Sequence, residues 1–591
     1  MKTRDQIDSK HKWNIASMYP DEKTWGEDCA KAASLAEGFA RFSGNLGKSP
    51  ATLLSAFRQR DELWLTAERV YVYARMKRDE DNRVAKYQAM VDKCQSLVAK
   101  ASAATSFFTP ELLEMAESEL LEFIAREEGL KLYEFAIMNA LRLKSHVLTK
   151  PEESIMAQYS EITGAPGDIF TMLNNADIKF GSITGEDGGT VELTHGKYSG
   201  FMESYDRRVR KDAFEHMYAA YKKNINTIAA AFSYNTKTDV VASRVRKYDS
   251  SLHSALAGDN IPVSVYDNLI DVVNENLNTL HRYMGIRKKA LGLDELQMYD
   301  VYVPLIKVPE REIPYETAAS TIEAGLAPLG REYVSKMKDG LASGWVDVYE
   351  NEGKTSGAYS FGCYDSMPFI LLNYAGKMKD VFTLAHEMGH SMHSLYTRAA
   401  QPFIYGGHSI FTAEVASTVN ESLLMKHLLS TEKDPEVKKY LLNMYIEEFR
   451  TTLFRQTMFA EFEKHTHQAA ESGEALTAEW LSEEYGKLNR RYFGSSVAES
   501  EDIRCEWARI PHFYSAFYVY KYATGFSAAT AISDLILSQG AGAYTEFLKS
   551  GESDHPIELL KIAGVDMSSP EPVKLAMKTF ENLVEEFEKL L

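Results

Sequence analysis

The sequence contains an HExxH motif, which is typical of a metal site, at His386-Glu387-Met388-Gly389-His390. Residues four apart on a helix share a face, so His386 and His390 can bind one Zn²⁺ through neutral imidazoles at about 2.0–2.1 Å each. Glu387 can reach a metal-bound water without being a ligand, as a general base requires. The pattern predicts metal-assisted hydrolysis. The alternative is a helix with two hydrogen-bonded histidines and an ordinary surface glutamate.

A third ligand is predicted in the next helical pattern, which runs from Phe411 to Leu428. A catalytic zinc ion has three protein ligands and one open position. Glu414 follows His390 after the Gly406-Gly407 loop and would complete a His₂Glu set. Glu421 lies about two turns further along the same helix face, where it can orient a zinc-bound imidazole by accepting a hydrogen bond. The alternative for Glu421 is a solvated or capping carboxylate.

Two more histidines lie close to this region in the sequence. His393 is three residues past His390 on the same face, and it is either a group behind the metal ligands or a core histidine. His408 lies in the loop before the second helical pattern. We predict a surface-loop role for His408, and the alternative is a donor to substrate.

One helix and one strand are expected to position the HExxH residues. A helix is predicted from Asp380 to Tyr396, with Asp380 as its N-cap and no proline to interrupt it. The preceding run from Phe369 to Tyr374 is typical of an edge strand. Such a strand could bind an extended peptide through backbone pairing.

The rest of the chain reads mostly as helix, with apolar residues recurring every three or four positions. The segment from Ile178 to Gly196 instead alternates short β-prone runs around Asp187-Gly188-Gly189 and predicts a hairpin. Further non-helical zones are expected at 299–314 and 342–374. We therefore predict a mainly α protein in two parts. Residues 1–195 form an N-terminal helical lobe ending in the hairpin, and residues 196–591 form a catalytic helical domain.

Charge and composition exclude several classes of partner. The 591 residues have a formal net charge of −18, which disfavours binding to nucleic acid or to anionic membranes. No signal peptide and no apolar run of transmembrane length is visible. Four scattered cysteines without a CxxC pair favour a reducing compartment, so a cytoplasmic location is expected. No feature of the sequence indicates an oligomeric state.

Several motifs together resemble the thimet oligopeptidase family of zinc peptidases, and in particular its oligoendopeptidase F branch. The family pattern HExGHxxH is met from His386 to His393, and its third ligand, a glutamate followed by another seven residues later, matches Glu414 and Glu421. The stretches GAYS (from Gly357), PFILLNY, AEVASTVNE, LHRYMGIRKKALGLDELQMYD and PHFYSAFYVYKYATG also resemble that branch. The resemblance covers most of the chain and is strongest from about residue 200 onward.

This resemblance implies a two-lobed, zincin-like helical molecule with a deep substrate channel and a small β region next to the zinc helix. One zinc ion would lie at the channel floor, and only short peptides would enter. In the family, a histidine and tyrosine hydroxyls stabilise the oxyanion of the tetrahedral intermediate. His512 matches that histidine, and Tyr514 and Tyr520 are the best matches for the tyrosines.

The predicted activity is therefore a zinc endopeptidase that cleaves short oligopeptides. Three alternatives remain open at this point. One is a zinc carboxypeptidase on a similar helical scaffold, and another is a non-catalytic peptide-binding relative. The third is a structural zinc protein, which usually has four protein ligands and often thiolates. None of the four cysteines lies near the motif in the sequence.

Overall fold

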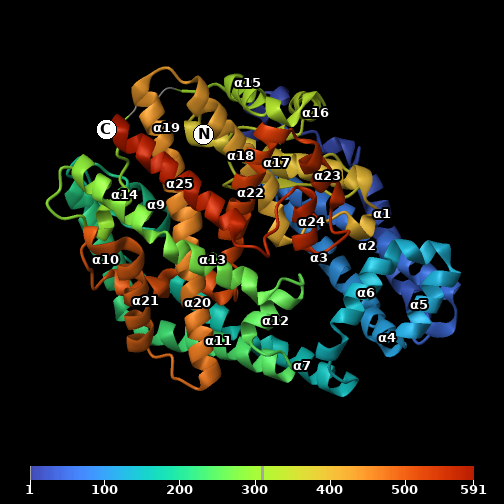
Figure 1. Ribbon diagram of the computed structural model, residues 1–591. Coiled ribbons are helices and arrows are strands. Elements are labelled where there is room, and N and C mark those ends of the chain that lie inside the picture. The colour runs from blue at the N-terminus through green and yellow to red at the C-terminus, as the bar shows by residue number, and fades with distance from the viewer. Residues whose placement is uncertain (1, 308–311) are drawn as a thin grey trace. The chain divides into compact units, whose positions relative to one another are not determined.

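A computed structural model describes residues 2–307 and 312–591, and helices dominate it as predicted (Figure 1). Contacts group the chain into two compact units. Unit 1 consists of Met1–Ser145, Glu310–His427 and Ile532–Val565, and unit 2 of His146–Pro309, Leu428–Ala531 and Asp566–Leu591. The division predicted from the sequence was continuous along the chain, whereas each of these units combines three separate segments.

Unit 1 contains the HExxH segment, a small sheet and a set of helices. Its helices are α1 (Glu22–Phe39), α2 (Pro50–Glu80), α3 (Ala85–Thr105), α4 (Phe108–Glu114), α5 (Glu117–Arg126), α6 (Glu134–Arg142), α15 (Tyr315–Gly325), α16 (Arg331–Ala342), α17 (Met378–Ala400), α23 (Gly542–Ser550) and α24 (Pro556–Ile562). Two helices contribute residues to both units, namely α18 (Ile410–Thr431) and α22 (Tyr520–Gln539).

Unit 2 contains the predicted hairpin and the remaining helices. Its helices are α7 (Lys150–Thr163), α8 (Ala165–Met172), α9 (His195–Met202), α10 (Arg207–Lys223), α11 (Ile225–Val245), α12 (Ser251–Ala257), α13 (Val263–Glu275), α14 (Leu277–Ala290), α19 (Pro435–Glu448), α20 (Arg455–Ser472), α21 (Ala478–Phe493) and α25 (Glu571–Leu590). The hairpin is confirmed as the antiparallel pair β1 (Ser182–Thr184) and β2 (Thr190–Glu192). Of the non-helical zone expected at 299–314, residues 308–311 lie outside the described residues.

The small sheet beside α17 has three strands in the order β3-β5-β4. β5 (Phe369–Leu371) pairs in parallel with β3 (Val346–Asp347) and antiparallel with β4 (Tyr359–Phe361). The prediction that Phe369 to Tyr374 forms an edge strand is therefore wrong, because β5 has a partner on each side. The edges of this sheet are β3 and β4, and both β4 and β5 contact α17.

α17 begins two residues before the predicted start. Its N-cap is Lys377, and Asp380 is the third helical residue rather than the cap. The Asp380 carboxylate reaches back and accepts hydrogen bonds from the backbone N–H groups of Ala375 and Lys377, both at 2.9 Å. A carboxylate at this position satisfies N–H groups that have no partner within the helix, so Asp380 stabilises the helix start without being the N-cap.

α17 and α18 approach so closely that backbone meets backbone at Gly389. A Cβ atom placed on Gly389 would lie 2.5 Å from the Cα of Ser417 and 2.7 Å from the carbonyl oxygen of Ala416. Nearby, the buried Asn420 side chain donates a hydrogen bond to the carbonyl oxygen of Ala385 across the same contact, at 3.1 Å. The glycine of the HExGH motif therefore allows α18 to lie directly against the helix that carries the histidines.

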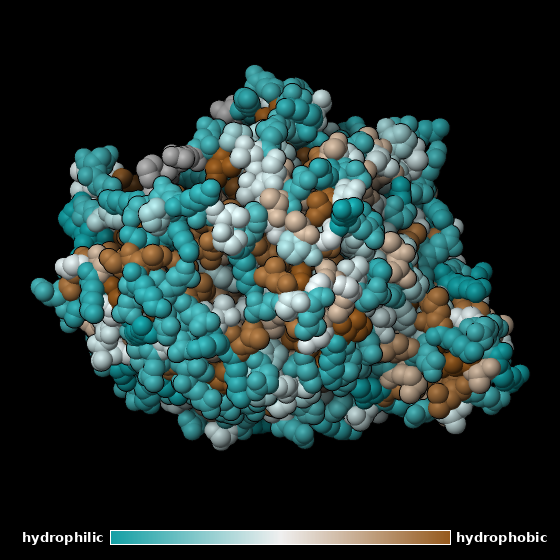
Figure 2. Space-filling model, turned by 45° about the horizontal axis from the view of Figure 1, so that its top comes forward, coloured by the Kyte–Doolittle hydropathy of each residue, from teal (hydrophilic) through white to brown (hydrophobic). Residues whose placement is uncertain are grey.

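Of the described residues, no helix is both long and apolar enough to cross a membrane. Figure 2 shows one face of the molecule, on which hydrophilic residues predominate and hydrophobic ones form separate patches. All four cysteines are buried free thiols.

Substitution of Gly389 tests the backbone contact. Gly389→Ala should destabilise the protein by about 1–3 kcal/mol, because a methyl group cannot fit against the backbone of α18 without shifting it. Gly26→Ala in α1 is the matched control, since a Cβ there meets nothing within 4 Å. It should stabilise by about 0.5–1 kcal/mol through lower backbone entropy in the unfolded chain. Denaturant unfolding measures both, and an unchanged midpoint for Gly389→Ala would contradict the contact.

Candidate metal centre

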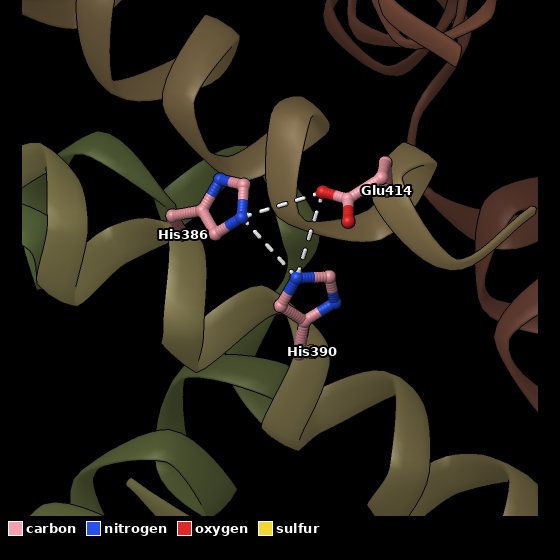
Figure 3. A group of neighbouring side chains, drawn as sticks. All are labelled: His386, His390 and Glu414. Carbon is pink, nitrogen blue, oxygen red and sulfur yellow. Dashed lines mark hydrogen bonds and ion pairs between the residues drawn. The ribbon is translucent and has the colours of Figure 1, made fainter. Parts of the chain in front are cut away.

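The side chains of His386, His390 and Glu414 converge on one point, the two histidines from α17 and the glutamate from α18 (Figure 3). Nε2 of His386 lies 3.2 Å from Nε2 of His390 and 3.4 Å from Oε2 of Glu414, and Nε2 of His390 lies 3.7 Å from the same oxygen. Ligands bound tetrahedrally at about 2.0–2.1 Å are separated by about 3.3–3.4 Å. The three atoms thus form one face of a tetrahedron of the size that zinc requires.

The chemistry of this donor set also fits a divalent cation. Two imidazole nitrogens face each other with a carboxylate beside them, which is the His₂Glu set used by catalytic zinc. Each of the three side chains is only partly buried, so a fourth position can remain accessible. Of the residues that the structure describes, these are the one group of three or more such side chains close enough to share an ion.

Glu421 lies behind the first histidine, on the side away from the converging atoms. Its Oε2 is 3.0 Å from Nδ1 of His386. A carboxylate at this distance accepts the Nδ1–H, which leaves Nε2 free as the metal-binding nitrogen and fixes the orientation of the ring. The structure therefore places Glu421 where the sequence predicts an imidazole-orienting acceptor.

Glu387 is next to the first ligand but is not part of the converging group, and only 8% of its surface is exposed. Burial raises its pKa to about 7, although the neighbouring His386 and the backbone N–H of Ser360 act in the opposite direction. A carboxyl group with a pKa near neutrality can both accept and release a proton under physiological conditions.

His393 and His408 pack against each other, with ring centres 3.7 Å apart. His393 is 2% exposed and also contacts Phe547. Its surroundings therefore favour the prediction of a core histidine. His408 is half-buried, and burial lowers its pKa to about 3. Its Nε2 lies 2.9 Å from Oγ1 of Thr397, whose hydroxyl donates to the carbonyl oxygen of Leu548 at 2.8 Å. Since that hydroxyl hydrogen is already used, Nε2 of His408 must be the donor.

The three remaining predicted site residues belong to unit 2, whereas the candidate metal ligands belong to unit 1. His512 is exposed on the short 3-10 helix η15 (Pro511–Tyr514). The Tyr514 ring stacks on Phe170 with centres 4.4 Å apart, and Tyr520 is fully buried at the start of α22. The roles of all three in oxyanion stabilisation stay predictions.

Two supporting residues were missed by sequence reasoning. Ser360 in β4 presents its backbone N–H to Glu387, and its hydroxyl lies 2.8 Å from that of Ser391 on α17. Asn420 joins α18 to α17, as described above. The stretch GAYS contains Ser360 and marks its location, but no pattern in the sequence indicates which partner its backbone meets.

The fold and the site together define a class, that of mainly helical proteins with a hydrolase-type metal centre. A family model described as Peptidase family M3 matches residues 200–579, and one described as Oligopeptidase F matches residues 111–180. The chain belongs to peptidase family M3, within its oligopeptidase F group, and so to the metallo-oligopeptidases. The resemblance inferred from the motifs is confirmed.

Individual relatives match along the full chain. Oligopeptidase PepF of Bacillus subtilis (strain 168) is 45% identical over 100% of this chain and 88% of the relative. The crystal structure of oligoendopeptidase-F from Enterococcus faecium is 38% identical, with a TM-score of 0.76 over 96% of this chain and 99% of that one. A crystal structure of a Chlamydophila abortus protein is 36% identical, with a TM-score of 0.93 over 100% of both chains.

Removal of the Glu421 carboxylate tests whether it orients His386. Glu421→Ala should weaken zinc binding by about 10- to 100-fold, because Nδ1 of His386 loses the acceptor that fixes the ring. Glu421→Gln keeps an acceptor oxygen and should lose less. Competition with a chromogenic chelator measures the affinity. Glu332→Ala, which removes an exposed carboxylate of α16 in the same unit, is the control and should bind zinc normally. Full affinity in Glu421→Ala would show that the contact has no such role.

Proposed function

We propose that this protein is a zinc-dependent endopeptidase that hydrolyses internal bonds of short oligopeptides. The observation that carries the proposal is the triangle of Nε2 of His386, Nε2 of His390 and Oε2 of Glu414, with edges of 3.2, 3.4 and 3.7 Å. Two imidazoles and one carboxylate favour zinc over magnesium or calcium, which prefer all-oxygen sites. The names of relatives as oligopeptidases and oligoendopeptidases support peptides as substrates.

The proposed chemistry assigns one proton path to Glu387. A zinc ion held by the three ligands would act as a Lewis acid and lower the pKa of a bound water toward about 7. Glu387 accepts the proton of the attacking water and later delivers it to the leaving amine. Its burial supports this role, because a desolvated carboxylate gains more from protonation than a solvated one.

The sheet edge next to α17 supplies a place for the peptide backbone. In the described part of the chain, β4 pairs only with β5, so its other side can accept an added strand. β4 contacts α17, and its Ser360 meets Glu387, so a peptide paired there lies beside the general base. A pocket of about 240 Å³ opens by the start of β4, lined by residues that include Ala358, Asn373 and Thr383. We propose that it receives a substrate side chain.

The oxyanion donors are proposed to come from the segment around His512. The residues that match the family's oxyanion donors are His512 and a tyrosine, either Tyr514 or Tyr520. A single donor of this type contributes about 3–4 kcal/mol to transition-state stabilisation.

Replacement of the general base tests the proton path. Glu387→Gln should retain one zinc ion per chain and lose about 10²- to 10⁴-fold in kcat, because an amide cannot accept the water proton. Metal analysis and steady-state kinetics on an internally quenched peptide measure both. Glu332→Gln on the exposed face of α16 is the control and should behave as wild type. Turnover near wild type in Glu387→Gln would rule out this assignment.

A panel of peptides tests the reaction class. The panel contains peptides of increasing length, each as a free acid and as a C-terminal amide, incubated with and without a zinc chelator. We expect internal cleavage of both forms, loss of activity with the chelator and recovery with added zinc. Cleavage of the free acids alone, from their C-termini, would indicate a carboxypeptidase. Binding without chelator-sensitive hydrolysis would indicate a non-catalytic peptide-binding protein.

A further inference from the structure

The backbone of Phe517 has a left-handed conformation that a bulky residue rarely adopts. Its φ is +53°, and the other non-glycine residues with positive φ in the described chain are Lys247 and Asn260. For L-amino acids this conformation brings Cβ close to the backbone carbonyl oxygen, so it persists only where the surroundings enforce it. Phe517 lies between η15, which carries His512 and Tyr514, and the start of α22 at Tyr520.

One buried carboxyl group holds this strained residue. Oε1 of Glu463 accepts a hydrogen bond from the backbone N–H of Phe517 at 3.0 Å, and Glu463 is 1% exposed. Its other oxygen, Oε2, is buried without a hydrogen-bond partner. Burial raises the pKa of Glu463 well above its usual range, although the hydrogen bond from the Phe517 N–H acts in the opposite direction.

Aromatic packing on the same helix face holds Phe517 and the preceding Phe513. The Phe517 ring packs on His467 with centres 4.4 Å apart. The Phe513 ring lies 5.3 Å from both Phe459 and Phe462. Together with Glu463, these residues occupy positions i, i+3, i+4 and i+8 of α20, which form one helix face. One face of α20 therefore holds Phe513 and Phe517, while Tyr514 packs on Phe170 of α8 and Tyr520 packs on Tyr266 of α13.

We propose that Glu463 is a positioning residue for the reaction, acting through its hydrogen bond to Phe517 to hold His512 and the tyrosines of this segment in their working geometry. The inference rests on the proposed function, in which those side chains donate to the oxyanion. It adds a residue on another helix that touches neither substrate nor metal.

The mechanical reason is that the left-handed backbone of Phe517 lies in the short connection between the two groups of donors. If the N–H of Phe517 loses its acceptor, φ can relax to the negative values that L-residues prefer. Rotation about that bond turns η15 with respect to α22, so His512 and Tyr520 can no longer both keep their positions. Donors aimed at a transition state are sensitive to such shifts, and a displacement of about 1 Å can cost about 10²-fold in rate.

Two variants of Glu463 test this role: one removes the hydrogen-bond acceptor, and the other keeps an acceptor oxygen in the same shape. Glu463→Met removes the acceptor at nearly constant volume, whereas Glu463→Gln is a neutral isostere that still offers an oxygen to Phe517. Glu461→Met is the matched control, because Glu461 is also buried on α20 but bonds to Arg491, Tyr492 and Asn274. The readouts are kcat, KM, zinc content, Tm and the Ki of a phosphinic peptide that mimics the tetrahedral intermediate.

We expect Glu463→Met to lose about 10- to 100-fold in kcat and a similar factor in phosphinate affinity, with KM and zinc content near wild type. Glu463→Gln should restore kcat to within about threefold. Glu461→Met should lower Tm while keeping kcat per folded molecule. If Glu463→Met lowers only Tm, or if the Gln variant is as impaired as the Met variant, the positioning role is wrong.

His512→Ala separates failure of this inference from failure of the proposed function. If His512→Ala lowers kcat and phosphinate affinity but Glu463→Met does not, the oxyanion role stands and the positioning role is overturned. If His512→Ala and the matching Tyr514→Phe and Tyr520→Phe variants all leave kcat unchanged, the segment has no donor role. In that case both the oxyanion assignment and the inference fail, while the metal chemistry of Glu387 is judged by its own variant.

Discussion

The candidate metal centre depends on the close contact between the backbones of α17 and α18 at Gly389. Any side chain at that position would meet Ser417 and Ala416 at less than van der Waals distance. Because α18 lies against α17, the side chain of Glu414 reaches the two imidazoles directly from its helix. For the same reason, Glu421 reaches Nδ1 of His386. One glycine thus determines the position of both the third ligand and the group that orients the first ligand.

The charged and polar side chains of the centre are arranged to favour a bound cation. Two imidazole nitrogens lie 3.2 Å apart, and Glu414, Glu421 and Glu387 surround them with carboxylates. Each carboxylate is distinguished by its neighbours. Hydrogen bonding to His386 lowers the pKa of Glu414, while desolvation raises that of Glu387. The two helices therefore carry one carboxylate suited to bind a cation and another suited to accept a proton, because burial and pairing act on chemically similar side chains in opposite directions.

Sequence reasoning succeeded where the determining interactions are local. The spacing of His386 and His390 on a helix, and of Glu414 and Glu421 on the next, follows from the helical repeat alone. It failed for β5, because strand order depends on β3 and β4, whose pairing is not encoded in the alternation of Phe369 to Tyr374. Asp380 was misplaced as an N-cap because the same carboxylate can serve from the third helical position.

The bond from Glu463 to Phe517 has no sequence signal at all, since a left-handed phenylalanine is recognised only from its backbone. It nevertheless follows the same logic as the contact at Gly389. In each unit, a backbone feature that most residues would not tolerate lies against a neighbouring helix. Gly389 approaches the backbone of α18, and the N–H of Phe517 is bonded to Glu463 on α20. The left-handed conformation of Phe517 is costly and persists only where the surrounding structure enforces it.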